Sequence, residues 1–292
     1  MTMDWKAVDQ RLIRRGELIL DLKTIRNHAE EVRKMNQGKP GPRYKLSNSY
    51  IRLLAAIRYI YQFPYRQLEG YTNIIHRLVP ELPTGDYSGL RKRILRQPVD
   101  PYEHLRETDA PFCIALDSTG VKVEKAGGWI ERRHGKKKRY VKLHFAVRVD
   151  THEVVAMEVT TDDVHDVSAL PGLVEESGRN VRVRQVLGDP TYDSSKVYSL
   201  LEGLGIEAVA KPKANARDDR GHPGRRWAAS VIGALGYGGW ARVMGYGRRW
   251  AVETAYSTFK RSFGEGVMGR SLGSIAVELV GKVALYDALV NG

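Results

Sequence analysis

The chain has 292 residues, of which 42% are hydrophobic and 28% charged, as in a globular protein with a sizeable core. Its 47 Lys and Arg outnumber 34 Asp and Glu, and the net charge of +13 indicates a polyanionic partner, either nucleic acid or an acidic membrane surface. The lone Cys113 excludes a disulfide framework, and no secretory signal or membrane-spanning run is recognisable, so we expect a cytoplasmic protein without a membrane partner.

The first third of the sequence has the pattern of helices. Residues 10–36 predict a helix within an N-terminal arm, residues 1–43. A helix, a short helix opening at Pro64, and a turn followed by a basic helix then predict a helix-turn-helix-like DNA-binding region over 44–97. Its expected exposed cations are Arg91, Lys92, Arg93 and Arg96. The alternative is a helical bundle that only braces the rest of the protein or forms a dimer interface.

A linker over 98–109 leads into a region of different pattern, residues 110–292. Three apolar or alternating runs predict a meander of strands, and helix and strand then alternate to residue 210. We expect a mixed α/β sheet flanked by helices, preceded by the all-helical domain. Residues 211–247 predict an irregular basic connection, and 271–290 a final amphipathic core helix.

Three acidic residues stand out in this second region. Asp117 interrupts an apolar strand pattern, Asp189 follows the end of another strand, and Glu253 lies among cations on a predicted helix. Each alone has an ordinary explanation as a turn residue, helix cap or ion pair. Together they predict a site for two Mg²⁺ or Mn²⁺ ions, because hard oxygen ligands without His or Cys neighbours favour those metals.

The cations around Glu253 suggest phosphate contacts. On one continuous helix, Tyr246, Arg249 and Lys260 would fall within about 40° of Glu253, and Arg248 adds a further charge. Residues 211–270 hold 12 Lys or Arg against four Asp or Glu, which is most of the net charge. Another basic cluster at an expected hairpin tip, which is otherwise a solvated loop, adds further candidate DNA contacts at Lys136, Lys137 and Lys138.

The spacing Tyr246-x2-Arg249-x3-Glu253-x6-Lys260 resembles the signature of insertion-sequence DDE transposases. The blocks "ALDSTGVKV", "RYVKLHFAV", "VTTDDVHDVSALPGLV" and "GDPTYDSSKVY" resemble those of the insertion-sequence-five group, and "PYRQLEGY" resembles its N-terminal region. The resemblance implies a ribonuclease-H-like fold with Asp117, Asp189 and Glu253 as catalytic, metal-binding triad. It also implies hydrolysis at the element's ends, strand transfer into target DNA, and a homodimer on the terminal inverted repeats.

Several alternatives remain open at this stage. The protein could be a domesticated regulator that binds DNA without cutting it, although the three acids argue against that, or a host nuclease without a joining step. His165 and Asp166 would either approach the metals or cap the next helix, and capping is favoured. Asp193 is expected to be a helix N-cap. Trp227 and Trp240 would either stack on unpaired bases or be buried.

Overall fold

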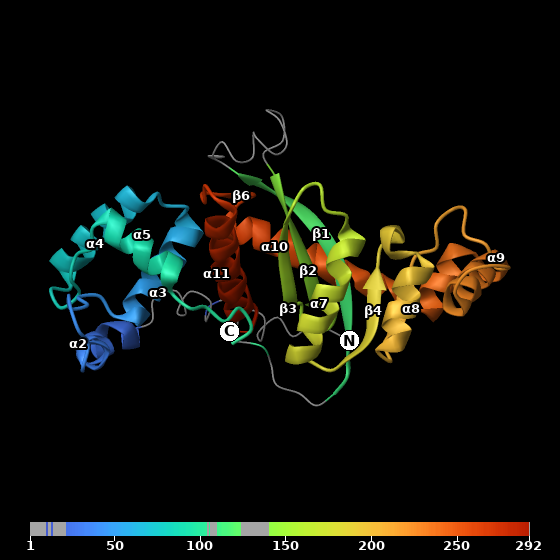
Figure 1. The fold of residues 1–292 in the computed structure, drawn as a ribbon, viewed down its shortest axis with the longest axis horizontal. Helices are drawn as coiled ribbons and strands as arrows, with labels where there is room; N and C mark the ends of the chain where they lie inside the picture. Colours follow the sequence, from blue (N-terminus) through green and yellow to red (C-terminus); the bar gives the residue numbers. More distant parts are fainter. Residues whose placement is uncertain are drawn as a thin grey trace. The chain divides into compact units, whose positions relative to one another are not determined.

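The structure is a computed structural model that describes residues 22–103, 110–123 and 140–291, with positions 10, 13 and 105. It contains two compact units, each drawn in Figure 1. The helical unit comprises the described residues of Met1–His104 and of Ser262–Gly292. The sheet unit comprises those of Leu105–Val123 and Lys137–Arg261. None of the helices in the described ranges is both long and apolar enough to cross a membrane.

The helical unit is built from α2 (Leu22–Asn36), α3 (Asn48–Tyr61), α4 (Tyr65–Leu78), α5 (Tyr87–Arg96), the short β6 (Gly266–Val267) and α11 (Leu272–Asn291). The helix starts follow the sequence: the Ser47 side chain caps α3 and the Asp86 side chain caps α5. Leu54, Leu68 and Leu90 are fully buried where α3, α4 and α5 meet. The predicted order of helices over 44–97 is therefore present, and its role in DNA binding remains a prediction.

One element of this unit is unexpected. We predicted that the last helix belongs with the catalytic residues 110–292, whereas α11 groups with the first helices and packs on α3 and α5. Two buried charges explain the attachment: the Arg58 guanidinium of α3 lies 3.6 Å from the Glu278 carboxylate of α11. Side-chain pairing across that separation has no local sequence signal. The other predicted domain boundaries stay predictions.

The sheet unit has the strand order β3-β2-β1-β4-β5. The strands β1 (Phe112–Val123), β2 (Tyr140–Arg148) and β3 (Val154–Thr161) form an antiparallel meander, and β4 (Val183–Gly188) and β5 (Glu207–Ala210) continue the sheet in parallel with β1. The helix α7 (Asp166–Asn180) covers one face, with α10 (Trp250–Phe263) behind the sheet, as Figure 1 shows. This mixed sheet flanked by helices, in a ribonuclease-H-like order, confirms the predicted fold class.

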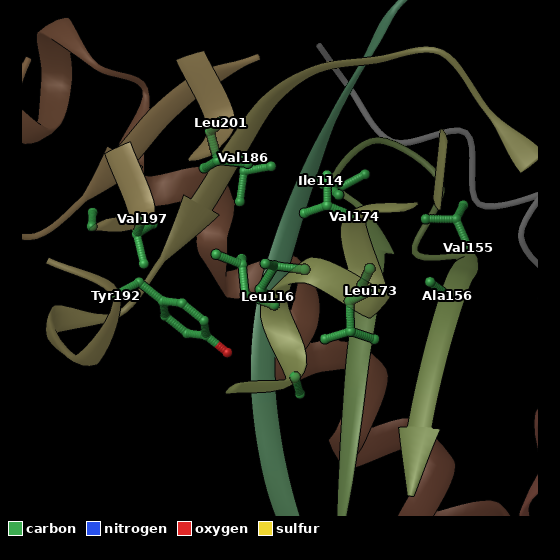
Figure 2. Close-up of a cluster of buried hydrophobic side chains, with 14 of the residues drawn as sticks. Ile114, Leu116, Val155, Ala156, Leu173, Val174, Val186, Tyr192, Val197 and Leu201 are labelled. Atoms are coloured by element: carbon green, nitrogen blue, oxygen red, sulfur yellow. The ribbon is translucent and has the colours of Figure 1, made fainter. Parts of the chain in front are cut away.

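The core between the sheet and α7 decides which way Asp117 points. Ile114 and Leu116 of β1 pack with Leu173 of α7 and Val186 of β4 (Figure 2). Because side chains alternate along a strand, Asp117 projects to the opposite face, toward α10. Its cross-strand neighbour Phe145 confirms this direction, since the Phe145 ring stacks on a tyrosine of α10.

Two predictions of local structure were wrong. Residues 211–247 are not irregular throughout, because Pro223–Val243 form α9, interrupted at Gly236, which has φ 67°. The stripe around Glu253 is also not one continuous helix. Tyr246–Arg249 form the separate 3-10 turn η2, and α10 begins only at Trp250. Gly245 before this turn has a left-handed φ of 59°, a conformation that glycine adopts without strain.

Candidate active site

Asp117 and Asp189 lie at equivalent positions of neighbouring parallel strands. In the register of β1 and β4, Ala115 is opposite Leu187, and each aspartate follows two residues later. Adjacent strands are about 4.8 Å apart, so the two carboxylates emerge close together at the carboxyl end of β4. The sheet itself therefore brings these two sequence-predicted residues to one place.

The Asp189 carboxylate is held by the turn that follows it. The strand ends at Gly188, and η1 (Pro190–Tyr192) begins immediately after Asp189. Asp189 Oδ1 accepts a 2.9 Å hydrogen bond from the backbone N–H of Thr191 and another from the Thr191 hydroxyl. At Gly188, a Cβ atom would lie 2.8 Å from the Tyr192 ring, so the close packing of this turn requires glycine. The pattern "GDPTY" thus fixes where the second aspartate points.

Arg249 connects the remaining acid to Asp117. Its Nη2 donates a short hydrogen bond to Glu253 Oε1, one turn further along, and its Nη1 lies 3.6 Å from Asp117 Oδ2. The guanidinium therefore stands between a carboxylate of β1 and a carboxylate of α10. All three predicted acids consequently belong to one site in the sheet unit, with a cation already placed among them.

Electrostatics agree with this convergence. Burial raises the pKa of Asp117 to about 6, the Ser118 N–H and Arg249 act in the opposite direction, and Asp189 and Glu253 raise the pKa further. A buried carboxylate facing two other acids is poorly stabilised in its charged form. Groups of this kind cluster at functional sites, because function rather than stability retains them.

A tyrosine that the sequence did not single out fixes α10 against the sheet. The Tyr256 hydroxyl lies 2.7 Å from the carbonyl oxygen of Asp117 and 2.9 Å from that of Leu143, both of which accept its hydrogen bond. Its ring stacks on Phe145 with centroids 4.6 Å apart. Tyr256 follows Glu253 by three residues on the same helix, so it sets the position of that carboxylate. The only sequence signal was this i, i+3 spacing.

The residues that we expected to contact DNA around Glu253 differ from one another in burial and in hydrogen-bond partners. Tyr246 is buried, and its hydroxyl donates to the backbone oxygen of Gly188, so it contacts protein where we expected DNA. Arg248 reaches Gln185 Oε1 at 2.5 Å. Lys260 is half-buried near the end of α10. Of this group, Arg249 alone bridges two of the predicted acids within the described residues.

The remaining predicted residues lie elsewhere. On α5, Arg91, Lys92 and Arg96 are exposed as expected, but Arg93 is not, because it donates to Leu46 O and Asn48 Oδ1. Lys136, Lys137 and Lys138 fall outside the described residues.

His165 and Asp166 stand at the start of α7. His165 occupies the N-cap position, yet its side chain makes no capping hydrogen bond. Asp166 instead accepts a 3.0 Å hydrogen bond from Lys142 Nζ. Burial raises the pKa of Tyr256, and the negative charges of Asp117 and Asp166 both raise it further. Asp166 therefore interacts electrostatically with the same tyrosine as Asp117. Capping, the role that we favoured, is therefore not what these side chains do.

Asp193 was expected to cap a helix, and Trp227 and Trp240 were expected either to stack on bases or to be buried. Ser194, not Asp193, caps α8 (Ser195–Gly203). Asp193 is buried and accepts hydrogen bonds from Lys213 N–H and the Arg225 guanidinium. Trp240 is fully buried, whereas Trp227 is 49% exposed on α9.

The site has the ligand chemistry of a divalent-cation site, and the Arg249 guanidinium supplies positive charge beside two of its carboxylates. Three carboxylates without His or Cys partners offer the hard oxygen donors that Mg²⁺ and Mn²⁺ prefer. Across the part of the chain that the structure describes, no three acidic, His or Cys side chains lie close enough to form a metal-binding group. The Arg249 guanidinium fills the space between Asp117 and Glu253. The three acids therefore offer oxygen donors of the right chemistry for such a cation, and in this structure Arg249 contacts two of them.

Comparison with known proteins assigns the family. A family model described as a transposase DDE domain matches residues 111–286, and a second with the same description matches residues 13–126. Among solved structures, the piggyBac transposase synaptic complex with hairpin DNA is similar at 9% identity and a TM-score of 0.47, over 96% of this chain and 74% of that one. The Drosophila P element transposase strand transfer complex follows at 11% identity and a TM-score of 0.33, over 93% and 70%.

A third structure, a pre-cleavage Mos1 transpososome, has 11% identity and a TM-score of 0.25, over 78% of this chain and 82% of that one. Structural similarity at these levels adds nothing to the assignment, which rests on the family models. The first of them spans more than half of the chain, including all three acids. A DNA-binding regulator without cleavage activity is accordingly disfavoured. The chain belongs to the transposase DDE-domain family and is a DNA transposase, an enzyme that cleaves DNA strands and transfers them.

Proposed function

We propose that Asp117, Asp189 and Glu253 are the catalytic carboxylates of an insertion-sequence transposase that cuts the ends of its element. One observation carries this proposal: Asp117 and Asp189 occupy equivalent positions on adjacent parallel strands, and Arg249 links Asp117 to Glu253. The family resemblance and the carboxylate donor set support two Mg²⁺ or Mn²⁺ ions at this site. When bound, such ions activate a water or a 3′ hydroxyl and stabilise the departing oxygen.

The protein's own residues have separate tasks in this proposal. Asp117 and Asp189 present their carboxylates from β1 and from the end of the adjacent strand β4, while Tyr256 holds the helix that carries Glu253. Arg249, which lies beside Asp117 and Glu253, would grip a phosphate of the strand being cut, because a guanidinium binds phosphate oxygens in a two-point geometry. Lys260 and Arg248 are further candidates for phosphate contacts. The 3′ hydroxyl freed by hydrolysis then attacks a phosphodiester of target DNA, so that a new P–O bond joins the element's end and the target's own P–O3′ bond breaks, releasing a 3′ hydroxyl.

Recognition of the ends is proposed for residues 44–97, since sequence readout requires a helix that enters the major groove. The exposed Lys92 and Arg96 of α5 are the best candidates there, and Arg93 is better explained by packing. Pairing of two ends calls for a homodimer on the terminal inverted repeats, and the DNA substrate places the enzyme in the cytoplasm with the chromosome.

The test compares cleavage and binding in matched variants. Duplexes carrying the inverted repeats that flank the gene are incubated with Mg²⁺ and with Asp117→Asn, Asp189→Asn or Glu253→Gln protein. Each variant should lose strand cleavage by at least about a thousandfold, while binding of the duplex changes little. The exposed Asp218→Asn and Glu265→Gln serve as controls with the same chemical change. Metal-dependent cutting by a triad variant at the control rate would exclude that residue from the site.

A second arm separates transposase from nuclease, and ends from other sequences. Wild-type enzyme should yield joined products with a target plasmid, whereas nicks without joined products would indicate a nuclease. Lys92→Ala and Arg96→Ala in the intact chain should reduce the preference for end duplexes over scrambled ones. An unchanged preference would place end recognition outside α5.

A further inference from the structure

A cavity of about 650 Å³ lies within the helical unit, whereas the three carboxylates belong to the sheet unit. Its walls come from α3, α4, α5 and the segment from Met268 to Glu278 that leads into α11. Both parts of the wall belong to the same compact unit. The volume falls in the range of small-ligand sites, which is about 300–1,000 Å³. Nothing in the proposed cleavage chemistry uses this cavity.

The cavity is strongly cationic. Its lining includes four arginines and one acidic residue, and these are Arg58, Arg66, Arg91, Arg270 and Glu278. The single carboxylate is already engaged, because Glu278 accepts hydrogen bonds from the backbone N–H groups of Met268 and Gly269 and pairs with Lys282 at 3.2 Å. Positive charge therefore exceeds negative charge along the lining of the cavity, which favours an anionic occupant.

Arg58 is the strongest sign that an anion is expected. Its side chain is only 3% exposed, yet its Nε–H has no hydrogen-bond partner among the described residues. Its distance of 3.6 Å from Glu278 is too long for a good hydrogen bond. A buried cation with an unused donor is costly, and such a group calls for a specific explanation. A phosphate oxygen in the cavity would supply the missing acceptor.

Aromatic faces complete the lining. The Arg58 guanidinium lies 4.4 Å from the centre of the Tyr65 ring, and the Arg66 guanidinium lies 4.9 Å from that of Tyr87. Tyr87 is 43% exposed, so part of its ring remains available for contact. Arginines alternating with aromatic rings are the surface on which unpaired bases stack while their phosphates are neutralised.

We propose that this cavity binds a single unpaired nucleotide of a DNA strand. Arg66 and Arg91 contact its phosphate, the Arg58 Nε–H donates to one of its oxygens, and the base stacks on Tyr87. The proposal rests on the proposed function in one respect, which is that the bound nucleotide belongs to a DNA strand. A free nucleotide would offer the same phosphate and base. An unstacked base is required because the neighbouring base pairs of a duplex cover both faces of a stacked base.

The test uses the full chain in EDTA, so that binding is measured without cleavage. The probe is 5′-phosphorylated tetrathymidylate labelled at its 3′ end, followed by fluorescence anisotropy, with dTMP and inorganic phosphate as competitors. Arg66→Ala and Arg91→Ala should each weaken binding about tenfold. The controls remove the same charge from exposed positions of this unit that do not line the cavity. Arg77→Ala on α4 and Arg52→Ala on α3 should change binding less than about threefold.

Stacking is tested separately at Tyr87. Tyr87→Phe keeps the aromatic face and should bind like wild type, whereas Tyr87→Leu should weaken binding about fivefold or more. Tyr61→Leu removes an exposed tyrosine that does not line the cavity and should have no effect. Thermal melts confirm that each variant is folded.

The competition results distinguish a nucleotide within a DNA strand from a free nucleotide and from a simple anion. Losses confined to the cavity variants, with weak competition by dTMP and none by phosphate, support a nucleotide within a strand. Competition by dTMP as strong as that of the oligonucleotide points to a free nucleotide, and equal competition by phosphate points to an anion site; either overturns the proposal. Equal losses in cavity and control variants also overturn it. Asp117→Asn should leave binding of the oligonucleotide intact. A failure of the nucleotide-binding proposal can therefore be distinguished from a failure of the cleavage proposal.

Discussion

The Tyr246 hydroxyl donates a 3.0 Å hydrogen bond to the carbonyl oxygen of Gly188. Gly188 is the last residue of β4 and immediately precedes Asp189. Tyr246 itself is buried, and its ring lies 4.9 Å from that of the fully buried Trp240. The tyrosine of the signature therefore connects the turn before α10 to the strand end that presents the second aspartate. We therefore expect Tyr246 to act as a positioning residue for Asp189.

Removing that hydroxyl should affect turnover more than DNA binding. Tyr246→Phe keeps the ring packing but leaves the Gly188 carbonyl without its partner, so the free energy of unfolding should fall by about 1 kcal/mol. We expect kcat for strand cleavage to fall about tenfold with KM for DNA unchanged. Steady-state cleavage and urea melts measure both quantities. A rise in KM at constant kcat would instead support a DNA-contact role, and Tyr237→Phe on α9 is the control with an exposed hydroxyl.

Asp117→Asn should make the metal-free protein more stable while removing its activity. The raised pKa of about 6 means that the ionised carboxylate is unfavourable in the folded protein at pH 7. Relieving this cost should raise the free energy of unfolding by about 1–3 kcal/mol, offset in part by loss of the Arg249 contact. Chemical denaturation in EDTA at pH 7 measures the change. Asp150→Asn should act in the opposite direction, because the Arg148 guanidinium pairs with that carboxylate at 3.0 Å and, against the effect of burial, lowers its pKa.

Asp193 joins the loop after Asp189 to the basic segment before α9. It is 2% exposed and accepts hydrogen bonds of 2.8 Å from Lys213 N and 2.7 Å from Arg225 Nε. Asp193→Asn removes the charge opposite Arg225 and should cost about 3 kcal/mol of stability. In the double variant with Arg225→Met the two losses should be clearly less than additive. Additive losses, measured in a double-mutant cycle by urea denaturation, would show that the pair is not coupled.

Buried His144 predicts a pH dependence of stability. Burial lowers the pKa of His144 from 6.5, the Asp166 charge acts against this shift and the Lys142 charge adds to it. Below pH 6.5 the unfolded chain therefore binds a proton that the folded protein resists, so stability is complete above that pH and falls as the pH drops. His144→Gln should reduce the stability lost between pH 7.5 and 5.5 by about 1 kcal/mol. Parallel pH curves for wild type and variant would exclude His144 as a contributor.

The sheet and its acids were predictable because their signals are local. The apolar run from Phe112 to Leu116 marks β1 as a strand, and Asp117 stands out because it interrupts that run. In contrast, α9 carries several glycines, which are unfavourable in helices, so propensity pointed the wrong way. The break before α10 depends on the backbone of Gly245, and the role of Tyr246 depends on a carbonyl 58 residues away. Contacts of that kind have no periodic signature in the sequence.

The pairing of Arg58 with Glu278 has a consequence for how the protein is made. The ribosome delivers α3 about two hundred residues before α11, and at about 5–20 residues per second this delay lasts roughly 10–40 seconds. During that interval Arg58 has no Glu278 carboxylate, and Tyr59 lacks the Gly281 backbone against which it packs. The sheet unit, whose strands and helices run from β1 at Phe112 to α10, is delivered before α11 and can reach its native state first. The helical unit is begun first and finished last.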